Sequence, residues 1–292
     1  MKKKIILLSI GFVLLWNSGF IGAEYGLPYT GPFTLIFWRY LAVTLLIAVY
    51  LILRKRLKWI GFRAASLNML IGFLAHGVWL TCVLFALDNE VPAGIVALVV
   101  ALQPLATGAL SGYVTSEKTG TYQWWGLIAG FVGVAVTVGF RIGDGNSGSI
   151  FGYLIPLCSV IGITIATLIQ RRMEITNDSA KLPLDQTLFY QSFATVLVLL
   201  FPAYFLENFQ TQWKPQFVYA MLWLIVGVSL GAYILMWSLI DRLDATRVAS
   251  LFYLGPPVTM LMGWMAFGDS IITTDVVGIV IVFVGVLLTQ RN

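Results

Sequence analysis

Long apolar segments alternate with short polar ones along the whole chain. Many of the apolar segments reach the ~20 residues that a helix needs to cross a bilayer, and no polar segment is long enough to form a separate domain. Helices satisfy their own backbone groups in lipid, as isolated strands cannot. We therefore predict an all-α membrane protein with ten transmembrane helices, at about residues 4–23, 32–53, 66–87, 91–115, 121–140, 149–170, 185–206, 217–240, 245–267 and 272–290.

The second half of the chain repeats landmarks of the first half at a nearly constant spacing. The paired landmarks lie 152 or 153 residues apart: Pro104 and Pro257, Glu117 and Asp269, Gly126 and Gly278, and Gly133 and Gly285. Five spans per repeat is an odd number, so the second repeat enters the membrane in the opposite direction. We predict two inverted five-helix repeats, residues 1–141 and 148–292, whose glycine-bearing fifth and tenth spans pack closely as scaffold or dimer contacts.

Composition supports this class and excludes several others. Hydrophobic residues make up 59% of the chain and charged residues 11%, whereas soluble domains carry about 25% charged residues. The net charge of +5 forms no face for nucleic acid, because the basic residues lie between spans. Cys82 and Cys158 lie inside spans and form no metal or redox pattern. Since a nucleotide-binding loop is also missing from the sequence, we predict no cofactor and no metal site.

The basic residues indicate the orientation of the chain, because cytoplasmic loops are enriched in lysine and arginine. With the N-terminus inside, only Arg141 and Lys214 fall on the outer side, and Arg39 stays within a span. The remaining fifteen fall on the inner side: Lys2, Lys3, Lys4, Arg54, Lys55, Arg56, Lys58, Arg63, Lys118, Arg171, Arg172, Lys181, Arg242, Arg247 and Arg291. Both termini are therefore predicted to be cytoplasmic.

The arrangement of these landmarks resembles the EamA-like branch of the drug/metabolite transporter superfamily. The matching residues extend over the whole chain: Trp16-Asn17, Pro32, Phe37-Trp38-Arg39-Tyr40, Pro104, Glu117 and Gly126, followed by Pro257, Asp269 and Gly278. The resemblance implies ten helices in two repeats and the export or exchange of small metabolites across a bacterial inner membrane. It does not identify the substrate.

Arg39 is the one basic residue well inside a predicted span, where a charge costs at least ~2.5 kcal/mol. At the repeat spacing it corresponds to Gln191, so the charge is present in one repeat only. One interpretation is a clamp for a substrate carboxylate, which a guanidinium binds well. The other is a structural tie to Glu24 or to loosened backbone carbonyls.

His76 is the only histidine and lies near the middle of the third span. Histidine titrates near neutral pH, so one interpretation is a group that couples transport to protons or contacts the substrate. The other is a neutral histidine bonded to a neighbouring helix. All acidic residues lie in or near loops, so we do not predict a proton relay built on carboxylates.

Prolines interrupt the fourth and ninth spans, at Gln103-Pro104 and at Gly255-Pro256-Pro257. Each interruption frees a backbone carbonyl. The freed carbonyls, with Gln103, Tyr253 and Thr259, either line a polar cavity or belong to kinks that serve packing alone. Matching depth in the two repeats favours the cavity.

Aromatic side chains away from the span ends supply candidate walls for that cavity. They are Trp16, next to Asn17, together with Trp79, Tyr190 and Trp237. A buried indole N–H requires a partner, and aromatic walls suit apolar ligands. Taken singly, each of these side chains is equally consistent with core packing.

These features predict a secondary transporter, an exporter or exchanger of small amphipathic metabolites such as amino acids or their derivatives, working by alternating access. The predicted substrate-contacting residues are Trp16, Asn17, Arg39, His76, Trp79, Gln103, Tyr190, Gln191, Trp237 and Tyr253. The alternatives are a multidrug-type or nucleotide-sugar-like permease and, outside transport, an integral-membrane enzyme or a non-transporting scaffold. No catalytic constellation is present in the sequence, so we do not predict an enzyme. We expect membrane lipids as partners and a monomer or homodimer.

The charge distribution gives a direct test of topology. Reporter tags fused at Met1 and at Asn292 should both report the cytoplasm, and a tag inserted within 141–148 should report the outside. A periplasmic C-terminus would contradict the inverted-repeat arrangement.

Overall fold

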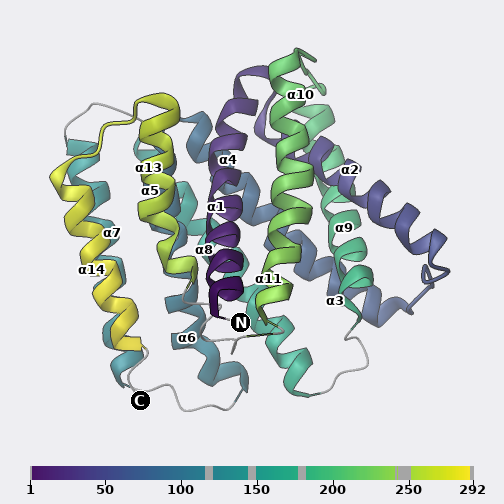
Figure 1. Cartoon of the computed structure of the whole chain (residues 1–292), viewed down its shortest axis with the longest axis horizontal. Coiled ribbons are helices and arrows are strands. Elements are labelled where there is room, and N and C mark those ends of the chain that lie inside the picture. The colour runs from purple at the N-terminus through teal and green to yellow at the C-terminus, as the bar shows by residue number, and fades with distance from the viewer. Residues whose placement is uncertain are drawn as a thin grey trace.

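The computed structural model describes residues 2–115, 121–143, 149–176, 182–240, 242 and 251–289, and their regular structure is helical (Figure 1). The first repeat comprises α1 (Lys2–Gly26), η1 (Leu27–Tyr29), α2 (Pro32–Leu53), α3 (Phe62–Gly72), η2 (Phe73–Val78), α4 (Trp79–Asp88), α5 (Ala93–Val100), α6 (Leu102–Thr115) and α7 (Thr121–Gly143). The second comprises α8 (Ile150–Ile175), α9 (Leu184–Phe205), α10 (Pro215–Leu222), η3 (Trp223–Ala232), α11 (Tyr233–Ile240), η4 (Phe252–Leu254), α13 (Gly255–Phe267) and α14 (Thr273–Thr289).

Most of the predicted spans are present as long apolar helices. In the described part of the chain, seven segments are long and apolar enough to cross a membrane: Lys4–Tyr29, Pro32–Leu53, Phe62–Asp88, Trp124–Ile142, Ile150–Met173, Leu184–Phe205 and Pro215–Met236. Two shorter apolar helices, Ala93–Gly108 and Thr273–Leu288, lie where the fourth and tenth spans are predicted. The beginning of the predicted ninth span, 245–250, lies outside the described residues. The chain is therefore a multi-pass all-α membrane protein, and the number ten stays a prediction.

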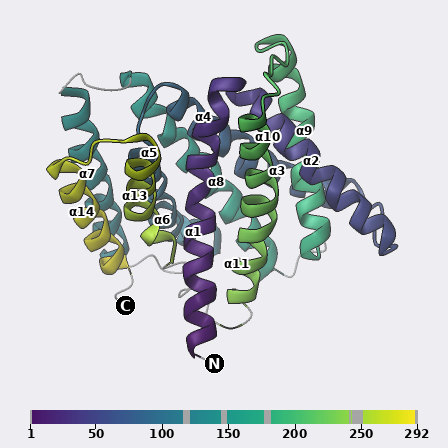
Figure 2. The same ribbon diagram turned by 45° about the horizontal axis from the view of Figure 1, so that its top comes forward.

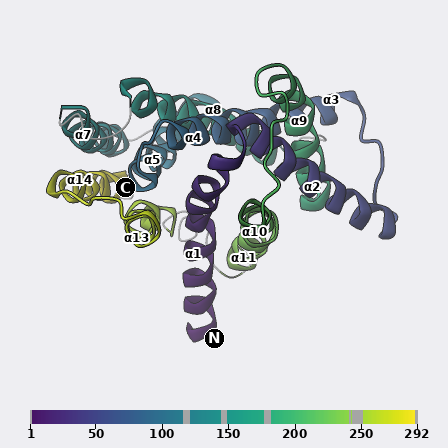
Figure 3. The same cartoon turned by 90° about the horizontal axis from the view of Figure 1, so that it is seen from above.

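Equivalent helices of the two repeats pack against one another. Seen from above, α7 lies beside α14 at one end of the molecule and α2 lies near α9 at the other (Figure 3). Between them, α5 packs against α13. In addition, α1 of the first repeat packs against η3 of the second, and α8, the counterpart of α1, packs against η2 of the first. Every one of these contacts relates one repeat to the other, which is the arrangement expected for a duplicated membrane unit.

The paired helices run in opposite directions. Thr30, just before α2, forms an antiparallel backbone bridge with Thr211, which follows α9. The carboxylate of Glu207, also after α9, accepts hydrogen bonds from the backbone N–H groups of Phe33 (3.1 Å) and Thr34 (2.6 Å) in the first turn of α2. These N–H groups have no partner within their own helix, so Glu207 both caps α2 and joins the repeats. α1 begins and α14 ends on the same side of the molecule (Figures 1 and 2).

Small residues allow α7 and α14 to approach closely, as the sequence predicts. A Cβ added at Gly133 would collide with the carbonyl oxygen of Gly278, and one added at Gly285 would collide with that of Gly126. Backbones that approach this closely gain packing energy in a lipid environment, where no hydrophobic effect drives helices together. The glycine faces are thus used within the chain, for the contact between its repeats.

The upper ends of α7 and α14 are joined by a buried ion pair. The guanidinium of Arg141 donates from Nε to Asp275 Oδ1 (3.1 Å), from a terminal nitrogen to Asp275 Oδ2, and from the same nitrogen to the carbonyl oxygen of Ser270 (2.7 Å). Arg141 is 6% exposed and Asp275 is fully buried. Arg141 therefore does not lie in the loop after the predicted span 121–140, because α7 continues to Gly143 and a carboxylate neutralises the charge of Arg141. The outer side of the membrane stays a prediction for this end of α7.

The acidic landmark of the second repeat lies close to this ion pair. Asp269 is in the turn between α13 and α14, where burial raises the pKa of its carboxyl group and the nearby positive charge of Arg141 lowers it in part. The corresponding landmark of the first repeat, Glu117, lies outside the described residues.

The ion pair predicts a stability pattern. Arg141→Met should destabilise the protein by about 3–5 kcal/mol, because it leaves Asp275 charged and buried without a partner. The double variant Arg141→Met/Asp275→Leu should recover most of that loss, because it removes both charges together. The measurement is thermal unfolding in detergent, followed by size-exclusion chromatography. A double variant no more stable than the single one would show that the pair contributes through geometry rather than charge compensation.

Candidate functional site

Two π-helical segments lie at matching positions in the two repeats. η2 interrupts the third predicted span between α3 and α4, and η3 interrupts the eighth between α10 and α11. Shifted by the repeat spacing of 152, residues 73–78 fall on 225–230, within η3. Wide turns of this type occur frequently at functional sites. Neither segment contains proline, the residue from which the other helix breaks were predicted.

Each π-helical segment binds a polar side chain from the opposite repeat. Arg39 of α2 donates a hydrogen bond from Nε to Ser229 Oγ in η3, over 2.9 Å. Gln191 of α9, which occupies the equivalent position, contacts His76 in η2, with 3.2 Å between Gln191 Oε1 and His76 Nε2. The equivalent positions 39 and 191 therefore make similar contacts, one with a charged side chain and one with a neutral side chain, to partners that differ by one position at the repeat spacing.

His76 is held between two partners in a buried chain of hydrogen bonds. Gln191 Oε1 can only accept, so His76 Nε2 carries the proton and donates it. In the neutral ring, His76 Nδ1 is an acceptor and takes the hydrogen bond of the Tyr40 hydroxyl at 3.0 Å. Both imidazole nitrogens therefore have a hydrogen-bond partner. Close contact here requires Gly72, because a Cβ at that position would collide with the backbone of Gln191.

A small cavity lies directly beside this network. Its polar and aromatic lining comes from four elements: Trp16 of α1, Arg39 and Tyr40 of α2, Trp79 of α4, and Tyr233 of α11, with apolar side chains between them. The rings of Trp16 and Trp79 are stacked with centroids 6.4 Å apart. The cavity measures about 40 Å³, and a single water needs ~10–15 Å³. It therefore has room for a few waters, and the structure represents a nearly closed state of the site.

Two side chains that line this cavity carry N–H groups that make no hydrogen bond within the described residues. Within the described residues, the indole Nε1 of Trp79 is buried and makes no hydrogen bond. The terminal nitrogens of Arg39 likewise make none there, since its bond to Ser229 uses Nε. The tie of Arg39 to Glu24 considered above is not present, and Glu24 lies near Asp269 instead. Buried donors are normally satisfied, so the cavity is suited to a ligand that carries acceptors.

Other predicted site residues hold helices together outside the cavity. Asn17 donates to the carbonyl oxygen of Val13 (2.7 Å) and accepts from the hydroxyl of Thr259 (3.0 Å), which joins α1 to α13. Gln103 donates to Thr167 Oγ1 at 3.4 Å, which joins α6 to α8. These side chains already have partners in this conformation.

Two other predicted aromatic residues, Tyr190 and Tyr253, also lie away from the cavity. The hydroxyl of Tyr190 donates to the backbone carbonyl oxygen of Lys58 (3.2 Å) near the lower side of the molecule. Tyr253, in η4, packs against the main hydrophobic core. The side chain of Trp237 lies outside the described residues.

Both predicted helix breaks exist, although neither lines the cavity. α5 ends at Val100 and α6 begins at Leu102, just before Pro104. α13 begins at Gly255 after the short 3-10 helix η4, with Pro256 and Pro257 in its first turn. The two interrupted spans pack against each other through α5 and α13, so the breaks shape the contact between the repeats.

Sequence reasoning missed three residues that belong to the site: Tyr40, Tyr233 and Ser229. Tyr40 directly follows Arg39, and Ser229 corresponds at the repeat spacing to Gly77, the neighbour of His76. The repeat alignment could therefore have found Ser229. No sequence pattern indicated that Tyr233 faces the cavity, because the π-helical turn just before it changes the direction in which the side chains of α11 point.

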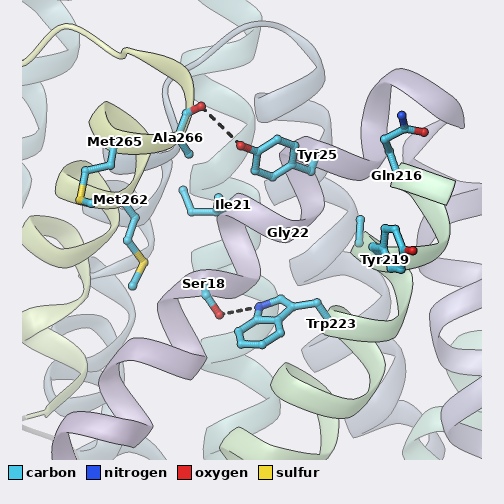
Figure 4. Close-up of a pocket in the computed structure, with 11 residues that line it drawn as sticks. Ser18, Ile21, Gly22, Tyr25, Gln216, Tyr219, Trp223, Met262, Met265 and Ala266 are labelled. Carbon is cyan, nitrogen blue, oxygen red and sulfur yellow. Dashed lines mark hydrogen bonds between the residues drawn. The ribbon is translucent and has the colours of Figure 1, made fainter.

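A larger hollow of about 450 Å³ lies on the other face of α1, between α10 and α13 (Figure 4). Ser18 and Tyr25 of α1 line it and bond across it, to Trp223 Nε1 (2.9 Å) and to the carbonyl oxygen of Ala266 (3.4 Å) respectively. At 100° per residue, Ser18 points away from Trp16 by about half a turn. This groove is therefore separate from the cavity.

Comparison with known proteins agrees with this architecture. Residues 3–139 and 150–291 each match the model of the EamA-like transporter family, so the chain belongs to that family. A solved crystal structure superposes with a TM-score of 0.66 at 16% identity, over 99% of this chain and 98% of the other, and shares the fold.

Several proteins similar to this chain are transporters or efflux pumps by name. An uncharacterized transporter of Bacillus subtilis is 24% identical and covers 100% of this chain and 93% of its own length. A probable amino-acid metabolite efflux pump of Salmonella typhimurium is 21% identical, over 99% of this chain and 95% of its own. A protein of the same description in Escherichia coli is 19% identical, with the same coverage. Family and relatives point to a membrane transporter of small molecules rather than an enzyme.

Proposed function

We propose that this protein is a secondary transporter that exports or exchanges small amphipathic metabolites by alternating access, with amino acids or their derivatives as the first candidates. The observation that carries the proposal is the guanidinium of Arg39, whose terminal nitrogens remain available at an aromatic-walled cavity. The names of the Salmonella and Escherichia relatives support the substrate class. We place the protein in a bacterial inner membrane with both termini in the cytoplasm.

In the proposed binding mode, a substrate carboxylate pairs with the terminal nitrogens of Arg39. The planar fork of a guanidinium matches a carboxylate in two parallel hydrogen bonds. The apolar part of the substrate lies against Trp16 and Trp79, and the unpartnered indole N–H of Trp79 supplies a second donor. Since the cavity has room for only a few waters in this conformation, the substrate must enter a more open one.

A nucleotide-sugar-like permease is the weaker alternative on these observations. A diphosphate carries at least two negative charges and is usually held by several basic groups. Within the described residues, Arg39 is the only basic side chain that lines the cavity. A multidrug-type permease agrees better with the aromatic walls, and the carboxylate dependence tested below separates it from an amino-acid exporter.

Coupling to protons is proposed to act through His76. Protonating Nδ1 reverses the hydrogen bond with Tyr40, because that nitrogen becomes a donor and the phenol oxygen accepts. The hydroxyl proton of Tyr40 then points to another acceptor, and Tyr40 also lines the cavity beside Arg39. This connects the protonation state of the imidazole to the hydrogen-bond donors of the site.

Substitutions of Arg39 test the carboxylate clamp. Arg39→Lys should weaken transport of a carboxylated substrate, because an ammonium cannot form the paired hydrogen bonds. Arg39→Gln should lower the preference for an amino acid over its amide by about tenfold to hundredfold, the equivalent of one or two charged hydrogen bonds. The measurement is counterflow in proteoliposomes with a matched pair, an amino acid and its amide.

Ser229→Ala is the matched control for this series. It removes the partner of Arg39 Nε but keeps the guanidinium, so the preference for the carboxylate should survive. If Arg39→Gln reduces the amino acid and the amide equally, in protein that is folded and present at the same level, Arg39 is a structural tie and the clamp is wrong.

His76→Gln tests proton coupling. The substituted amide keeps hydrogen-bonding capacity toward Tyr40 and Gln191 but cannot be protonated, so transport should lose its dependence on a pH gradient while substrate binding stays close to normal. Tyr40→Phe is the comparison variant, because it removes the hydrogen bond to His76 but keeps the titratable imidazole, so a dependence on the pH gradient should remain. Unchanged pH-driven flux in His76→Gln, at matched protein level, would assign His76 to packing.

A further inference from the structure

A second groove lies at the lower end of the molecule, between α3 and α8. Its volume is about 660 Å³, within the range of ~300–1,000 Å³ typical of ligand sites. Apolar side chains form its walls, among them Leu67, Ile165, Ile169 and Met173. Two arginines lie at one end, Arg63 in the first turn of α3 and Arg172 in the last turn of α8.

This groove is the repeat counterpart of the hollow between α1, α10 and α13. The family match begins at residue 3 in one repeat and residue 150 in the other, an offset of 147. With that offset, Ser18 and Tyr25 of the first hollow correspond to Ile165 and Arg172. Because the first hollow lies on the face of α1 turned away from the cavity, its counterpart on α8 likewise lies outside the transport site.

The two related grooves differ in charge. The described side chains that line the hollow at α1 include none that is charged, and its polar groups are those of Ser18, Gln216, Tyr25 and Tyr219. The fold therefore does not require basic residues in such a groove. The arginines of the α3–α8 groove belong to the end of the molecule where the basic residues of the sequence collect, next to exposed Trp59 and Phe62.

We propose that the groove between α3 and α8 binds an anionic phospholipid. Its phosphate lies between the guanidiniums of Arg63 and Arg172, and one acyl chain lies along Leu67, Ile165 and Ile169. Guanidinium groups pair with phosphate in fixed geometry, and basic pockets between membrane helices on the cytoplasmic side are a recurring way to hold anionic lipids. Exposed aromatic residues beside them match the level of the headgroups. The site is independent of the proposed transport function.

Native mass spectrometry of the full-length protein in detergent tests the proposal, with phosphatidylglycerol and phosphatidylethanolamine as the competing lipids. The wild-type protein should retain phosphatidylglycerol in preference. Arg63→Gln/Arg172→Gln should reduce that preference by about tenfold or more, because each of the two arginines contributes to the affinity for an anionic lipid. The control Arg54→Gln/Lys55→Gln removes the same charge from exposed residues at the same end, outside the groove, and should change the preference less than about twofold.

A third variant distinguishes a lipid from a phosphate ion. Ile165→Trp fills the apolar part of the groove at a position that is 44% exposed and keeps both arginines, so phosphatidylglycerol binding should fall. Soluble glycerol phosphate should bind weakly to every form. The proposal is overturned if the two double variants lose the preference equally, if Ile165→Trp binds phosphatidylglycerol like the wild type, or if glycerol phosphate competes at the same concentration as the lipid.

Discussion

The contact between α2 or α9 and a π-helical segment of the other repeat is the interaction on which the site depends. A charged or amide side chain in the middle of a membrane protein must find a partner inside the protein. Arg39 finds Ser229 and Gln191 finds His76, each on a widened turn that brings a polar group into reach. Because these contacts cross between repeats, neither half can form its polar centre alone. The buried pair of Arg141 and Asp275 joins the repeats in the same way at the upper end.

The difference between the two contacts gives the cavity its chemical character. The amide oxygen of Gln191 is bonded to His76 and its side chain is neutral, whereas Arg39 is charged and keeps its terminal nitrogens for another partner. The aromatic rings of Trp16 and Trp79 form apolar walls at the same place. A charge in such surroundings interacts strongly with an opposite charge, because the local dielectric is low. The site therefore selects by charge at one end and by apolar contact at the other, which is the pattern of an amphipathic ligand.

The sequence predicted long apolar spans, the repeat, the close-packing glycine faces of the fifth and tenth spans and the presence of Arg39 within a span, because hydrophobic length and residue spacing carry that information. It could not show which side of a helix faces the cavity. Asn17 and Trp16 are neighbours, yet one is saturated by Thr259 and the other lines the cavity. Tyr233 and Ser229 were missed because π-helical turns shift every following side chain away from the regular helical period. Arg141 was misplaced because its partner, Asp275, lies 134 residues away.

The matched π-helical segments also bear on the history of the chain. A π turn fits one more residue into a helix than the regular period allows, and η2 and η3 overlap when one repeat is laid on the other. The simplest account is that the wide turn existed in the five-helix ancestor before it was duplicated. On that account, the π-helical backbone of the binding centre arose before the polar side chains that now distinguish the two repeats. Arg39 against Gln191 and Ser229 against Gly77 are then later divergences, by which two once-equal halves became unequal in polarity while both kept a π-helical turn at this place.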